Sequence, residues 1–158
     1  MNLLGILTLL AVVLVSGCAT TSRPQCRVLE EEKIREMVLM ESLALRDTNR
    51  LVFVSFQDSA GNAFDPLDVV MARIHEAGIP ARKASEATKD SHTRVIDKGS
   101  GEPGVIYYAG VLKWVSNSKV EVVEGCTCAS LGGGLTEYTM KKKDGKWMRT
   151  KTKRMVMF

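Results

Sequence analysis

Apolar residues recur at two spacings along the chain, one typical of helices and the other typical of strands. Between residues 30 and 46 they return every three or four positions, which predicts an amphipathic helix. The compact run Leu51–Phe56 of β-branched and aromatic residues predicts a strand. A second helix is predicted over 66–77, because Asp65 can act as its N-cap and Pro66 suits its first turn.

The second half of the chain has the pattern of a β-meander. Four strands joined by short turns are predicted, over 105–115, 119–128, 135–142 and 147–158. Asp144 and Gly145 predict a tight hairpin between the last two strands. Residues 79–83 are expected to form a short strand, and the polar residues 85–98 an excursion over the surface. The two helices must then cover one face of the sheet, because no other segment can bury it.

The order of these elements resembles the cystatin-like and NTF2-like α+β domains. The pieces that carry the resemblance are the long strand 105–115, its hairpin to Val120–Val122, and the turn Lys143–Trp147. The resemblance implies two helices packed on a bent antiparallel sheet of four to five strands, within a single domain over 27–158. Such folds host enzymes, ligand pockets and inhibitors, so the resemblance implies a shape and no activity.

The N-terminal segment has the pattern of an export signal. Leu3–Val15 is almost wholly aliphatic, and residues 1–17 carry no charge. A helix over Leu3–Val15 would span roughly 20 Å, which is too short for a bilayer core of about 30 Å. Its length fits the apolar region of a secretory signal.

The end of this segment resembles the lipobox of bacterial lipoproteins. Val15, Ser16, Gly17 and Cys18 supply an aliphatic residue, two small residues and the acylated cysteine. The resemblance implies cleavage between Gly17 and Cys18, lipid chains on Cys18, and a lipidated tether over 18–26. Ala19 implies the outer membrane if the cell is Gram-negative. A conventional secretory signal cut near Ala19 and an uncleaved apolar anchor are the alternatives.

Positive charge concentrates near the C-terminus. The net charge of the chain is +4, and Asp144 is the acidic residue among the many basic ones between Lys141 and Arg154. A two-residue turn at Asp144-Gly145 would place Lys142 opposite Trp147 and Tyr138 opposite Lys151. One hairpin face would then show Tyr138, Lys142, Trp147, Arg149, Lys151 and Lys153. Aromatic rings among cations favour an anionic envelope component or protein as partner. The alternative is a solvated face, with its aromatic residues partly in the core and its lysines protecting an edge strand. Nucleic acid is not expected as a partner of an exported protein.

The cysteines and histidines predict no metal site and no cofactor. With Cys18 acylated, a disulfide from Cys26 to Cys126 or Cys128 is favoured over free thiols. The glycine pattern over 99–104 fits a dinucleotide fingerprint, but it precedes a strand rather than a helix, so a turn is expected.

The sequence favours a non-catalytic binding or structural module. It holds no nucleophile elbow of the G-x-S-x-G type and no H-E-x-x-H motif, and it assigns no catalytic residue. The alternative is a small-molecule or lipid pocket between the bent sheet and the second helix, lined by Met71, Tyr107 and Trp114. A hydrolase is the third and least favoured reading.

Overall fold

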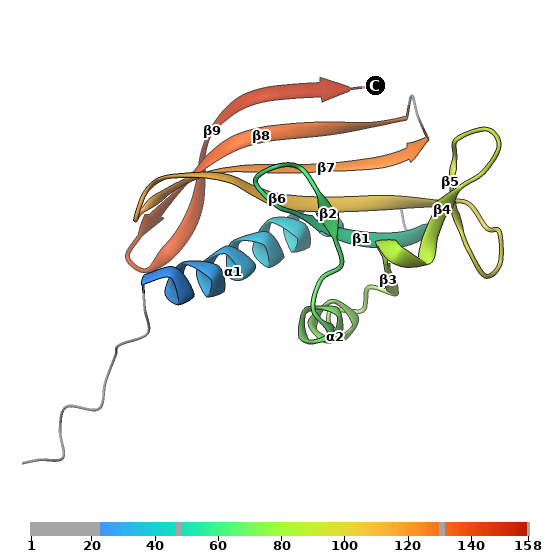
Figure 1. The fold of residues 1–158 in the computed structure, drawn as a ribbon, viewed down its shortest axis with the longest axis horizontal. Helices are drawn as coiled ribbons and strands as arrows, with labels where there is room; N and C mark the ends of the chain where they lie inside the picture. Colours follow the sequence, from blue (N-terminus) through green and yellow to red (C-terminus); the bar gives the residue numbers. More distant parts are fainter. Residues whose placement is uncertain (1–22, 47–48, 130–131, 158) are drawn as a thin grey trace, which may run out of the picture.

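The computed structural model describes residues 23–46, 49–129 and 132–157, and Figure 1 shows their arrangement. The predicted signal segment 1–17 and the residues 18–22 lie outside this part. The regular elements, in chain order, are α1 (Arg23–Ala44), β1 (Leu51–Gln57), β2 (Ala63–Phe64), α2 (Asp68–Glu76), β3 (Ala81–Lys83), a 3₁₀ turn (Ala84–Glu86), β4 (Ala87–Lys89), β5 (Val95–Asp97), β6 (Gly104–Ser116), β7 (Lys119–Ala129), β8 (Gly132–Lys143) and β9 (Lys146–Met157).

The described part is mostly sheet, with 52% of its residues in strands and 24% in helices. The main sheet has seven strands in the order β2-β1-β6-β7-β8-β9, with β3 also paired to β1. It is mixed, because β3 and β6 both run parallel to β1. The predicted fold class, an antiparallel sheet of four to five strands of the cystatin-like or NTF2-like kind, is therefore wrong. Local patterns had marked the strands, but they carried no information on which distant strands pair.

Both helices pack on the same face of this sheet (Figure 1). Apolar side chains from α1 and α2 join those of β1, β6, β7 and β8 in one core, which includes Ile34, Leu39, Leu43, Val54, Ile74, Val122 and Tyr138. The separate two-stranded sheet β4–β5 contacts β6 and β7 through β5. It occupies part of the segment that was predicted to be a polar excursion.

The starts of both helices differ from the predictions. α1 begins at Arg23, so residues 23–26 belong to the helix rather than to the tether. α2 begins at Asp68 with Leu67 at the N-cap position and no side-chain cap. Asp65 instead accepts a hydrogen bond from the backbone N–H of Ser85 at 3.0 Å, which ties the segment before α2 to the 3₁₀ turn.

Candidate functional site

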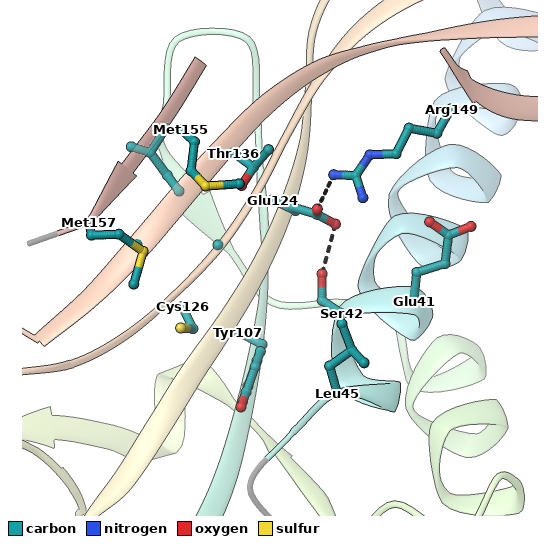
Figure 2. Close-up of a pocket in the computed structure, with 13 residues that line it drawn as sticks. Glu41, Ser42, Leu45, Tyr107, Glu124, Cys126, Thr136, Arg149, Met155 and Met157 are labelled. Atoms are coloured by element: carbon teal, nitrogen blue, oxygen red, sulfur yellow. Dashed lines mark hydrogen bonds and ion pairs between the residues drawn. The ribbon is translucent and has the colours of Figure 1, made fainter. Parts of the chain in front are cut away.

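A groove opens on the helix-covered face of the sheet, where α1 ends and the strands continue beyond it (Figure 2). Its volume is about 310 Å³. Most of its lining is apolar and comes from segments far apart in the sequence, including Leu45, Tyr107, Cys126, Leu135, Met155 and Met157. Met155 and Met157 are 68% and 79% exposed, so β9 presents two large apolar side chains to solvent. Exposed apolar groups gathered at a hollow are typical of a binding site.

A glycine shapes the groove where β8 begins. Gly132, Gly133 and Gly134, expected in a turn, pair with β7 as the first residues of β8. A Cβ at Gly134 would lie 2.8 Å from the sulfur of Met157, which is closer than real side chains approach. The absence of a side chain at Gly134 therefore lets Met157 lie against the strand.

Glu124 forms the polar end of the groove and links three elements. Its carboxylate accepts a hydrogen bond from Ser42 Oγ at 2.9 Å and forms an ion pair with Arg149 (Figure 2). It also accepts a hydrogen bond from Tyr138 Oη at 3.3 Å. The Arg149 guanidinium also lies 3.6 Å from the ring centroid of Tyr138. Burial, with Glu124 beside it, raises the pKa of Tyr138, so its hydroxyl stays protonated and can donate. These contacts hold β9 and the end of α1 against β7 and β8.

Cys126 lies in the groove opposite Tyr107 on the neighbouring strand. Burial raises the pKa of the Cys126 thiol, so the thiolate, which is the nucleophilic form, is scarce at neutral pH. No described residue that lines the groove is a histidine. His75 Nε2 lies 2.7 Å from the Ala81 carbonyl oxygen, and His92 is exposed in a turn. The described lining of the groove is therefore a mainly apolar surface.

The disulfide predicted from Cys26 does not fit this fold. Cys26 lies near the start of α1, while Ser42, near its end, lines the groove beside Cys126. Positions 26 and 42 of one helix are about 24 Å apart along its axis, whereas a disulfide joins Cα atoms about 6 Å apart. Within the described residues no disulfide links Cys26, Cys126 and Cys128. Cys128 Sγ instead lies 3.2 Å from the Gly132 carbonyl oxygen.

The side chains predicted to form one face for an anionic partner lie on both sides of the sheet. The predicted pairing of Lys142 with Trp147 is confirmed, but Lys151 lies opposite Thr139 rather than Tyr138. The cause is a β-bulge between Arg149 and Lys151, because one extra residue turns Lys151 to the other face. A second bulge between Thr152 and Arg154 restores the original alternation, so Met155 and Met157 face the groove. Tyr138 is fully buried under α1, and Lys153 pairs with Glu121 on the opposite side.

The predicted pocket residues do not share one cavity. Met71 is buried in the core, Trp114 lies beside the first half of α1, and Tyr107 alone of the three lines the groove. The methionines at the end of β9 were not predicted to form a site. Their exposure depends on the length of α1, which covers only part of the sheet, and no local pattern encodes that.

Two glutamates of α1 bind the two tryptophans of the chain. Glu30 accepts hydrogen bonds from Trp147 Nε1 at 2.6 Å and from Lys142 Nζ at 2.5 Å. Glu31 accepts one from Trp114 Nε1 at 2.7 Å, and the two indole rings meet edge to face with centroids 5.7 Å apart. The first half of α1 is therefore tied to β6 and to the β8–β9 hairpin.

Replacing Glu30 should make the stability of the protein less dependent on pH. The hydrogen bond from Lys142 is the main cause that lowers the pKa of Glu30 from its ordinary value of 4.5. A lowered carboxyl pKa stabilises the folded state above 4.5, and this contribution is lost as the pH falls through the folded-state value. We expect Glu30→Gln to lower the free energy of unfolding by about 1 kcal/mol at neutral pH.

Urea unfolding followed by tryptophan fluorescence, between about pH 7 and pH 3, measures this effect. The difference between wild type and Glu30→Gln should shrink as the pH falls. A difference that stays constant over this range would contradict the assignment. Glu76→Gln, at an exposed position at the end of α2, is the control and should change the stability by less than about 0.5 kcal/mol.

Comparison of the chain with protein families, with curated proteins and with solved structures found no match. Among the described residues, neither helix is both long enough and apolar enough to cross a membrane. The same part of the chain contains no group of three or more His, Cys, Asp or Glu side chains that could hold a metal ion.

Proposed function

We propose that this chain is a lipid-anchored protein of the bacterial envelope that binds a linear aliphatic chain, such as that of a fatty acid, without catalysing a reaction. The binding role is inferred from the apolar groove at the end of α1. Its volume of about 310 Å³ lies at the lower end of the range of small-molecule sites, about 300–1,000 Å³.

The shape and chemistry of the groove favour a flexible apolar ligand. The floor is a sheet surface lined by leucine, methionine and glycine, and the unbranched methionine side chains adapt to the ligand that they contact. The charged side chains at one end are Glu41, Glu124 and Arg149, and the last two are paired with one another. An aliphatic chain would cover Met155 and Met157 and remove apolar area from water, which contributes about 0.8 kcal/mol for each buried CH₂ group.

The proposed anchor rests on residues 15–18, where cleavage before Cys18 and acylation of its thiol would attach the domain to the outer membrane of a Gram-negative cell. The chain from Cys18 to Arg23 can extend about 18 Å at most. The groove lies at the far end of α1, about 33 Å further along the helix axis for its 22 residues. With its acyl chains embedded in the membrane, the anchor would leave the groove to a separate ligand.

A single charge in the groove should weaken ligand binding. We expect Met155→Asp to weaken the binding of dodecanoate about tenfold or more, because the carboxylate would have to lose water against an apolar chain. Isothermal titration of the purified full chain with dodecanoate measures the affinity. Met148→Asp is a matched control, because Met148 is also an exposed methionine of β9 but does not line the groove.

We expect the control to bind dodecanoate within about twofold of wild type. Equal losses in the two variants would show that the ligand does not occupy the groove. Absence of saturable binding by the wild type would overturn the proposed binding role. If dilution of the wild type instead reveals a dimer that Met155→Asp dissociates, the groove is covered by a second copy and the proposal is wrong.

A further inference from the structure

The helix-free face of strands β6 to β9 gathers lysines at the end where the β6–β7 and β8–β9 turns lie. We propose that this face docks onto the anionic lipid headgroups of the membrane that holds the anchor. The inference rests on the proposed lipid anchor. It adds the orientation of the domain relative to the membrane. The lysines of this face, here called the lysine face, are Lys113, Lys119, Lys141, Lys143, Lys146 and Lys151.

Strand register places two pairs of lysines directly opposite one another. Lys119 pairs with Lys141 across β7 and β8, and Lys143 pairs with Lys146 across the β8–β9 turn. Like charges at facing positions of an antiparallel pair are destabilising. In the described part, no carboxylate forms an ion pair with any of these four lysines. An anionic surface would relieve this repulsion.

The alternation of side chains sets the direction in which the lysines point. Val120 and Met140 are buried in the core under α1, so their neighbours Lys119 and Lys141 lie on the other side of the sheet. Glu121 lies among the lysines and forms an ion pair with Lys153 at 2.6 Å, and Lys113 and Lys119 also lower its pKa. Asp144 lies in the turn between Lys143 and Lys146. The net charge of the lysine face is positive. The side chains of Lys141, Lys143 and Lys146 are exposed to solvent.

The position of the proposed anchor favours a membrane as the partner of the lysine face. The bonds of Glu30 to Lys142 and Trp147 place the first turns of α1 at the β8–β9 hairpin, and Figure 1 shows the start of α1 beside that turn. Cys18 precedes Arg23 by only five residues, so an acylated Cys18 would hold this end of the domain within about 18 Å of the membrane. Cations next to an anionic leaflet add to the binding energy of a lipid anchor. The groove at the far end of α1 would then point away from the membrane.

Lysine acetylation of the full-length protein in vesicles tests this orientation. The protein purified from membranes is reconstituted into vesicles of phosphatidylcholine alone or with about one-third phosphatidylglycerol, and labelling is read by mass spectrometry. Lys141, Lys143 and Lys146 should react at least fivefold more slowly in the anionic vesicles, and high salt should restore their reactivity. Lys89, in the β4–β5 hairpin at the opposite end of the sheet, should react equally in both (Figure 1).

A pair of matched variants separates a local contact from a general effect of charge. Lys143→Gln with Lys146→Gln should return Lys141 to the reactivity seen in phosphatidylcholine. Lys89→Gln with Lys98→Gln removes the same charge from the β4–β5 region and should leave Lys141 protected.

Equal reactivity in the two vesicles, with the N-terminal peptide acylated, would overturn the docking surface and leave the anchor intact. Equal protection in both vesicles would show that protein rather than lipid covers the face, and would also overturn it. An N-terminal peptide without acyl chains would instead refute the anchor, and with it the inference.

Discussion

Replacement of Cys18 by serine is expected to abolish lipid attachment entirely. The thiol of Cys18 is the proposed acceptor of the diacylglycerol group, and a serine hydroxyl cannot form the thioether. Each acyl chain contributes about 0.8 kcal/mol for every CH₂ group buried in the bilayer, so two or more chains give stable anchoring and their loss removes it.

Metabolic labelling with an alkyne-tagged palmitate in a bacterial host measures this change directly. The wild-type chain should be labelled and the Cys18→Ser chain should not. Cys26→Ser is the control, because Cys26 is exposed on α1 beyond the proposed cleavage site, and it should keep the full label. Undiminished labelling of Cys18→Ser would contradict the proposed site of acylation.

Tyr138→Ala should cause the largest loss of stability of any substitution considered. Tyr138 is 0% exposed, lies between α1 and Arg149, and donates to Glu124. Its truncation leaves a cavity under α1, and removal of a buried aromatic side chain typically costs about 3–5 kcal/mol. Urea unfolding at neutral pH, followed by the fluorescence of the two tryptophans, measures the change.

Tyr138→Phe distinguishes packing from hydrogen bonding. This substitution keeps the ring under the Arg149 guanidinium and removes only the hydroxyl that lies 3.3 Å from Glu124. We expect it to cost about 0.5–1.5 kcal/mol. If the alanine and phenylalanine variants lose equal stability, the ring does not support the contact of α1 with the sheet as described.

Local patterns were sufficient to predict most of the strands and the turn between β8 and β9. Asp144 and Gly145 both have positive φ angles, of 51° and 78°, as the tight turn predicted from this pair requires. The turn fixes the pairing of Lys142 with Trp147 as predicted. The prediction failed six residues after the turn, at Lys151, because a β-bulge has no reliable signature in a single sequence.

The sheet and the groove depend on contacts between distant segments. The parallel pairing of β1 with β6 joins Val52 to Val105, and an alternating apolar pattern is compatible with either direction of pairing. The groove brings Leu45, Cys126 and Met155 together, and each of them was equally compatible with a buried or a solvated position. These features follow from tertiary packing, which overrides local preference.

The most direct test of the proposed binding role is the NMR spectrum of the full chain with ¹³C-labelled methionine methyl groups, recorded as dodecanoate is added. We expect saturable shifts of the Met155 and Met157 signals, while the signals of Met148, outside the groove, and Met71, in the core, stay in place. Unchanged Met155 and Met157 signals, or shifts that spread equally to Met148, would contradict the proposed binding role.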